Sequence, residues 1–384
     1  MLRDQTLLRI PGPTPVPPSV QRAMSQPMIG HRDQETKDLL KTITPKLKPI
    51  FGTEQDILIL SASGTAGLEA AVVNAVQPDD DVLVIVTGAF GDRFVKICNE
   101  YRISVHRYDV AWGEAVSPDA IASYLSEHPE IKAVFATYCE TSTGVLNPIE
   151  ELARVVRQQT DTLFIVDGVS CVGGVQTKMD EWGIDILVTG SQKAMMLPAG
   201  LTFAAVSERA WHVIERNERP SFYLDFKRYR DSLANNSSPF TPALSLLLGL
   251  EQTLSMLEEE GLEQVYQRHQ TMKEMTRAAF KALNIPLLTA DEVSSPTVTA
   301  IKPDDFEAEK LRGVLKNEFG LSAAGGQQHL KGQIFRIGHM GYCSPIDVLQ
   351  TISIIETALH RIGKSIVLGA GTRAAQEVLL KGGN

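Results

Sequence analysis

Short runs of Val, Ile and Leu recur along the first two-thirds of this chain, and helical patterns separate them. Most runs are apolar throughout, which is typical of strands buried on both faces of a mainly parallel sheet. Strand, helix and strand repeated in this order predict a doubly wound α/β domain. The predicted strands are 57–60, 82–86, 133–137, 163–166, 186–188 and 201–206, and the predicted helices include 67–76, 93–101, 118–127 and 149–158.

The pattern changes in the last third of the chain. A helical stretch from 242 to about 283, interrupted near Gly261, is expected to connect two domains. Beyond it, strand, helix, strand and helix predict a small α+β domain. These elements are 297–301, 306–319, 334–337 and 347–362, followed by a short helix at 374–380. We therefore divide the chain into an N-terminal arm (1–20), a large domain (21–260), a small domain (261–362) and a tail (363–384) whose last four residues should fray.

Charge and cysteine content exclude several classes of protein. With 37 Lys and Arg against 46 Asp and Glu, the formal net charge is −9, which removes the attraction to nucleic acids. The four cysteines form no C-x-x-C pair, so we expect a reducing compartment and no metal site. The proline-rich start is no targeting segment, and no apolar run approaches the roughly 20 residues that span a bilayer. A cytoplasmic protein without membrane partners is expected.

Three polar features follow predicted strands, where open α/β sheets bind their ligands. Residues 61–67 (SASGTAG) join a strand to a helix start, whose unpaired N–H groups could cradle a phosphate. Asp167 follows the strand 163–166, and Lys193 follows the strand 186–188 within Gly-Ser-Gln-Lys-Ala. Taken singly, each has an ordinary explanation as a helix cap, a turn cap and a solvated lysine.

Together the three features meet the requirements of one cofactor. A phosphate cradle, an acid that can pair with a pyridinium nitrogen and a lysine that can form a Schiff base are what pyridoxal 5'-phosphate requires. Small and apolar neighbours would desolvate Lys193, which lowers the pKa of its amine and frees it as a nucleophile. The combination predicts a pyridoxal phosphate site in one crevice.

Two more residues are candidates for this crevice. Phe90 follows the strand 82–86 among small residues, so its ring could stack on a planar cofactor or belong to the core. Arg336 places a guanidinium inside an apolar strand of the small domain. Such a group needs a partner, which is either an internal acid or the carboxylate of a substrate.

With these residues the sequence resembles the class V, fold-type I pyridoxal-phosphate aminotransferases, and most of all the alanine-glyoxylate, serine-glyoxylate and serine-pyruvate subgroup. The resemblance extends from Pro11-Gly12-Pro13 to about residue 362 and rests on the order and spacing of many segments. It implies a large domain with a mainly parallel seven-stranded sheet flanked by helices, plus a small C-terminal α+β domain. The matching segments are 28–32, 63–65, 140–146, 166–167, 182–185, 190–194, 221–225 and 335–338.

The resemblance also implies a role for each matching residue. Lys193 would form the Schiff base and move protons, and Asp167 would pair with the pyridine nitrogen. Arg336 would bind the substrate α-carboxylate, and Phe90 would take the ring-stacking place, where relatives often have tryptophan. The remaining cofactor contacts implied are Ser63, Gly64, Thr65 and Gln192 at the phosphate, Ser142 at the ring substituents and Thr241 from the partner subunit of a homodimer.

Transamination of a small amino acid such as alanine, serine or glycine with a keto acid such as glyoxylate or pyruvate is the function implied. Three arginines could still supply a cation for a side-chain carboxylate, namely Arg32, Arg107 and Arg228. A cysteine desulfurase would need a reactive cysteine ahead of Arg336, and residues 312–335 contain none, whereas Cys343 follows it. A non-catalytic, aminotransferase-like subunit of a larger complex is the third interpretation.

Overall fold

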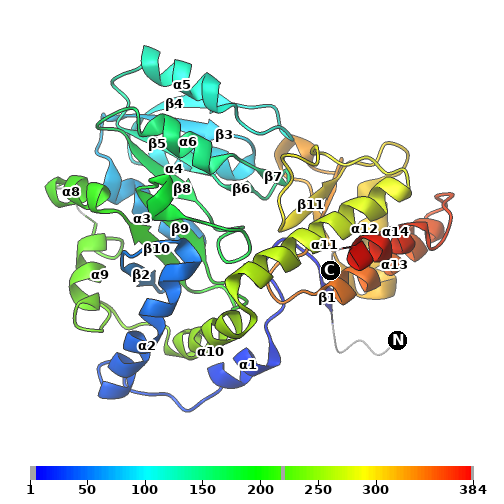
Figure 1. Ribbon diagram of the computed structural model, residues 1–384, viewed down its shortest axis with the longest axis horizontal. Helices are drawn as coiled ribbons and strands as arrows, with labels where there is room; N and C mark the ends of the chain where they lie inside the picture. Colours follow the sequence, from blue (N-terminus) through cyan, green and yellow to red (C-terminus); the bar gives the residue numbers. More distant parts are fainter. Residues whose placement is uncertain (1–5, 218–220, 382–384) are drawn as a thin grey trace.

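A seven-stranded sheet forms the centre of the computed structural model, which describes residues 6–217 and 221–381 (Figure 1). The strand order is β2-β10-β9-β8-β5-β3-β4, and only β10 runs antiparallel to its neighbours in this sheet. The mainly parallel sheet predicted from the sequence is thereby confirmed. Its strands are β2 (Ile57–Leu60), β3 (Asp81–Val86), β4 (Ser104–Asp109), β5 (Ala133–Thr137), β8 (Leu163–Asp167), β9 (Ile186–Gly190) and β10 (Thr202–Val206).

The edge strand β4 has no counterpart among the strands predicted from apolar runs. Its sequence, Ser-Val-His-Arg-Tyr-Asp, is largely polar and its side chains are exposed or half-buried. Because it lies at the edge, beside β3 alone, it does not need the apolar pattern that marks the central strands.

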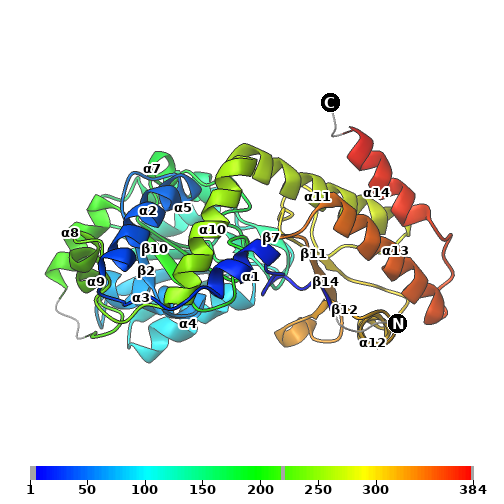
Figure 2. The same ribbon diagram turned by 90° about the horizontal axis from the view of Figure 1, so that it is seen from below.

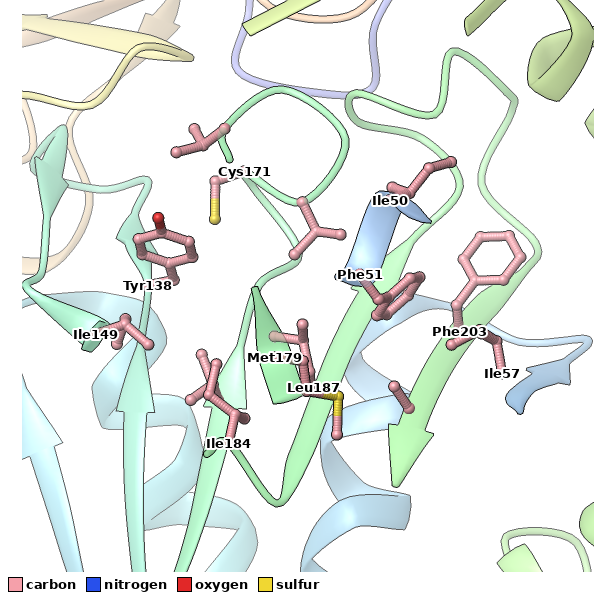
Figure 3. Packing of buried hydrophobic residues seen from close by; sticks show 14 of the residues in the cluster. Ile50, Phe51, Ile57, Tyr138, Ile149, Cys171, Met179, Ile184, Leu187 and Phe203 are labelled. Carbon is pink, nitrogen blue, oxygen red and sulfur yellow. The ribbon is translucent and has the colours of Figure 1, made fainter. Parts of the chain in front are cut away.

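Helices cover both faces of this sheet, as a doubly wound fold requires. Residues of β8 alternate between two hydrophobic clusters, with Phe164 and Val166 on one face and Leu163 and Ile165 on the other. Figure 3 shows part of the first cluster, where Phe51 lies beside Phe203 of β10. The first face carries α2 (Gln34–Phe51), α5 (Pro118–Glu127), α6 (Ile149–Val156), α7 (Met179–Trp182) and α10 (Leu244–Glu260), and the second carries α3 (Gly64–Ala75), α4 (Ala89–Glu100), α8 (Glu208–Arg216) and α9 (Phe226–Leu233).

The C-terminal part is built on a three-stranded antiparallel sheet, β11-β14-β13, with helices packed against it (Figure 2). The predicted helical stretch divides at Gly261, whose φ of +83° ends α10. The tail helix α14 packs on α11 and α13 and buries Ala375 among them. The elements are α11 (Leu262–Ala282), β11 (Val298–Ile301), α12 (Ala308–Phe319), β12 (Leu321–Ser322), β13 (Ala324–Gly325), the 3-10 helix η1 (Gln328–Leu330), β14 (Phe335–Gly338), α13 (Pro345–Arg361) and α14 (Ala370–Lys381).

The N-terminal segment joins the two halves of the molecule. Strand β1 (Leu7–Leu8) pairs in parallel with β12, and helix α1 (Pro18–Met24) packs on α10 (Figure 2). The two-residue strands β6 (Cys139–Glu140) and β7 (Val145–Leu146) complete the fold. The domain boundaries stay a prediction. Of the four residues expected to fray, Lys381 is the last residue of α14, and 382–384 lie outside the described residues. No helix within 6–217 or 221–381 combines the length and the apolar character needed to cross a membrane.

Candidate active site

Lys193 is buried just beyond the end of β9. Its side chain is 7% exposed, and its Nζ donates a hydrogen bond to the carbonyl of Pro11 in the N-terminal segment. A Cβ on Gly12 would lie 2.4 Å from the Lys193 Cδ, so only glycine allows this close approach. The pKa of Lys193 is lowered to about 8, mainly by burial and to a smaller extent by the cations Arg336 and Arg93. A substantial fraction of the amine is therefore neutral near physiological pH.

Asp167 closes β8, the middle strand of the sheet, and lies close enough to Lys193 to influence its ionisation. One carboxylate oxygen, Oδ1, accepts a hydrogen bond of 2.9 Å from the N–H of Val169. Burial raises the pKa of Asp167 to about 6. A cationic ring nitrogen beside this carboxylate would favour its ionised form, which is the arrangement that pyridoxal phosphate needs.

The segment before α3 forms an open cradle rather than a capped helix start. Ser63 occupies the N-cap position without a side-chain cap hydrogen bond, and both Ser63 and Thr65 are exposed. Gln192 contributes an amide whose Oε1 is buried without a partner among the described residues. A Cβ on Gly190 would lie 2.9 Å from this oxygen and 3.5 Å from the Gly64 Cα. Free helix N–H groups, two hydroxyls and an unpaired amide suit a phosphate.

Arg336 of β14 is a buried cation whose partners are backbone carbonyls. Nε and Nη2 donate to the carbonyl of Gly325 at 3.0 and 2.8 Å, and Nη1 donates to that of Thr141 at 2.8 Å. Within the described part of the chain no carboxylate forms an ion pair with it, so the alternative of a structural salt bridge is wrong. A guanidinium has five N–H groups, and the three hydrogen bonds leave two for a ligand.

Comparison with known proteins decides the family to which this pocket belongs. The family described as "Aminotransferase class-V" matches residues 8–343. The chain belongs to this family. The aminotransferase is 42% identical to a protein of Synechococcus named "Soluble hydrogenase, small subunit" (98% of this chain, 99% of that one) and 35% identical to the serine–glyoxylate aminotransferase of Methylorubrum extorquens (97% and 95%). It superposes on the crystal structure of pyridoxamine-pyruvate aminotransferase from Mesorhizobium loti with a TM-score of 0.94, at 30% identity and 98% coverage of both chains.

Membership makes this a pyridoxal-phosphate-dependent aminotransferase, and the residues present fit the cofactor. The unpaired Gln192 oxygen is the most telling detail, because a half-turn of the amide would present its NH₂ group to a phosphate. Lys193 and Asp167 are both buried, and each influences the ionisation of the other. The desulfurase alternative finds no support at Cys343, since burial raises the pKa of this thiol to about 11 and keeps it protonated.

The structure places Phe90 and Ser142 around a carboxylate that the sequence-based search did not single out. Glu140 is fully buried and accepts hydrogen bonds from the N–H groups of Phe90 (3.0 Å), Gly91 (3.1 Å) and Ser142 (3.1 Å). Ser142 donates its hydroxyl to Glu140 at 2.5 Å and accepts from the N–H of Ala89 at 3.0 Å. Glu140 and Ser142 thus cap α4 and orient Phe90. Because the Ser142 hydroxyl already donates its proton to Glu140, it can only accept a hydrogen bond from the cofactor.

Other candidates lie away from the pocket or have partners already. Thr241 is exposed in the segment between α9 and α10, and two residues further along the chain the N–H of Ala243 donates a hydrogen bond of 2.8 Å to the hydroxyl of Ser61. Arg107 pairs with Asp92 and Asp109, and Arg228 lies over the ring of Phe222. The sequence did not indicate three groups that contact the candidate site residues, namely Glu140, the Pro11 carbonyl and Arg93. A glutamate in an otherwise small and polar segment, 139–147, was the available signal for the first.

Proposed function

We propose that this aminotransferase transfers the amino group of a small amino acid, such as serine or alanine, to glyoxylate. The serine–glyoxylate relative supports the choice of substrates. The single observation that carries the proposal is Arg336, a buried guanidinium with two free N–H groups that forms no ion pair among the described residues. Such a cation binds the carboxylate shared by every amino acid and keto acid.

The chain's residues divide the work of the reaction. Bound pyridoxal phosphate supplies an aldehyde that takes up the amino group and a ring that delocalises the electrons released at the substrate Cα. Lys193 would hold the cofactor aldehyde through its neutral amine and would carry the proton that leaves the substrate Cα. Asp167 would hold the pyridine nitrogen, and Arg336 would orient the substrate through its carboxylate.

The proposed cofactor contacts follow from the same pocket. Ser63, Gly64, Thr65 and Gln192 would hold the phosphate, and Phe90 would stack on the ring. Ser142 would accept a hydrogen bond from a ring substituent. These assignments are supported by the exposed hydroxyls of residues 63 and 65, the unpaired Gln192 amide and the orientation of α4 by Glu140. A cytosolic location, as expected from the sequence, stays a prediction.

A panel of donors and acceptors tests the substrates. We expect kcat/KM for serine or alanine with glyoxylate to exceed that for aspartate with 2-oxoglutarate by about 100-fold. The reason is that the second carboxylate of aspartate or 2-oxoglutarate would be bound without a partner, which is costly. Initial rates would be measured for alanine, serine, glycine and aspartate against glyoxylate, pyruvate and 2-oxoglutarate. A preference for the dicarboxylic pair would contradict the proposal.

The hydrogenase name of one relative favours a second candidate, a subunit without aminotransferase activity in a larger complex. Absorbance separates the two functions. The enzyme, purified with its cofactor, should be yellow and change its spectrum when alanine or serine is added. A colourless protein that takes up no cofactor would instead support the subunit.

We further propose a homodimer in which Thr241 completes the phosphate site of the partner subunit. Support comes from an exposed aromatic cluster beside Thr241, in which Phe240 stacks on Tyr223 at 4.8 Å and contacts Phe222, whose side chain is 69% exposed. Exposed apolar patches of this kind mark protein interfaces.

Subunit complementation tests this dimer. Lys193→Ala and Thr241→Ala chains would be mixed, unfolded and refolded together. If Thr241 acts across the interface, each mixed dimer regains one intact site, and cofactor affinity at that site returns to the wild-type value. If Thr241 serves its own chain, mixing restores nothing, since every site then carries one of the two substitutions. Sedimentation of the wild-type chain as a monomer would also contradict the dimer.

A further inference from the structure

Arg93, on the first turns of α4, brings a positive charge to the start of α3. Its Nη1 donates a hydrogen bond of 3.1 Å to the hydroxyl of Thr65. Its Cζ lies 4.6 Å from the centroid of the Phe90 ring, as a cation–π contact requires. The guanidinium therefore lies between the two groups that are proposed to hold the phosphate and the ring of the cofactor.

Arg93 is half-buried rather than fully exposed on the surface of α4. Its charge lowers the pKa of both Asp167 and Lys193, although each has larger contributions from burial. Arg93 forms no ion pair with a carboxylate within residues 6–217 and 221–381. By contrast Lys96, one turn further along α4, is 70% exposed on its side chain and pairs with Asp92.

The cradle itself offers hydrogen-bond donors and the partial charge of a helix N-terminus but no full positive charge. Ser63, Thr65 and Gln192 are neutral, and the whole chain carries a formal net charge of −9. The overall field therefore opposes an anionic ligand, so binding needs a local cation. A guanidinium matches the oxygens of a phosphate with two parallel N–H groups, and its hydrogen bonds to an anion are about twice as strong as neutral ones.

We infer that Arg93 is a phosphate ligand of the bound cofactor and adds a full positive charge beside the start of α3. This inference rests on the proposed position of the phosphate at residues 63–65. It adds a residue to the cofactor site that the sequence search did not find, because Arg93 is 28 positions from Thr65 in the chain.

Two ligands that differ only in the phosphate provide the test. The cofactor-free protein would be titrated with pyridoxal phosphate and with pyridoxal, and binding followed by absorbance. For Arg93→Gln we expect the Kd for pyridoxal phosphate to rise about 10- to 100-fold, the effect of losing one charge-assisted hydrogen bond. The Kd for pyridoxal should change less than about twofold, since it lacks the group that Arg93 binds.

Matched variants separate this effect from damage to the fold. Lys96→Gln removes the same charge from the same helix and should leave both Kd values unchanged. Arg93→Lys keeps the charge but loses the parallel N–H groups of the guanidinium. Its Kd for pyridoxal phosphate should therefore lie between those of wild type and Arg93→Gln. If Arg93→Gln raises the Kd for both ligands equally, or changes neither Kd, the assignment is wrong. Unchanged cofactor affinity with a loss of kcat/KM for aspartate alone would also overturn it and would make Arg93 a ligand of the substrate side chain.

The outcome is independent of the proposed substrates. A wild-type protein that binds pyridoxal phosphate but does not use glyoxylate would refute the proposed reaction, while the comparison between Arg93→Gln and Lys96→Gln would still decide the phosphate contact. Thermal unfolding of the cofactor-free variants would confirm that each is folded.

Discussion

The Lys193→Ala variant is expected to lose transamination by on the order of 10⁴-fold in kcat, because one side chain both attacks the cofactor aldehyde and moves the Cα proton. The absorbance of the bound cofactor should change at the same time. Steady-state rates with serine and glyoxylate would be measured next to Lys178→Ala, which removes an ion-paired surface lysine as a control.

A small added amine such as methylamine should restore part of the Lys193→Ala activity, since it can replace the missing proton carrier but not a collapsed pocket. A Lys193→Ala protein with an unchanged spectrum and unchanged turnover would refute the assignment.

The pH dependence of cofactor uptake follows from the same lysine. Only the neutral amine attacks an aldehyde, and burial lowers the pKa of Lys193 from 10.5 to about 8. In the wild-type, cofactor-free protein, the rate of uptake should therefore rise about tenfold per pH unit below pH 8 and level off above it. Rapid mixing with pyridoxal phosphate between pH 6 and 10 would measure this. A rate that keeps rising to pH 10 would indicate a solvated lysine.

The Arg336→Gln variant should lose about 10²- to 10³-fold in kcat/KM for amino acids, the cost of removing a buried charge that binds a carboxylate. The kcat/KM of Arg336→Lys should at best lie between those of wild type and Arg336→Gln. A lysine ammonium cannot bind the carbonyls of Gly325 and Thr141 and the substrate carboxylate at the same time.

A substrate without a carboxylate separates binding from structural support. In the wild-type enzyme alanine should react far faster than ethylamine, and in Arg336→Gln this advantage should largely disappear. Arg312→Gln, which removes a neighbouring arginine hydrogen-bonded to Ala323, is the control and should keep the advantage. If Arg336 only supports the segments at Gly325 and Thr141, the rates with ethylamine and with alanine should fall equally in Arg336→Gln.

Local patterns predicted most of the fold and the centre of the site. The six apolar runs became strands of one sheet, and Asp167 and Lys193, which end or follow two of these strands, are both buried. The predictions were poorer where an element depends on a distant group. Helix α4 begins at Ala89, four residues before the predicted start at 93, because Glu140 caps it from another segment.

The sequence alone determined the class of fold, the cofactor chemistry and the residues that follow the strands, because apolar periodicity and strand-end positions are local properties of the chain. Tertiary structure alone decided what surrounds these residues. It brought Pro11 to Lys193, gave Arg336 carbonyl partners and turned Arg93 toward Thr65. The physical reason is that desolvation and hydrogen-bond partners depend on packing between segments far apart in sequence, which no local pattern records.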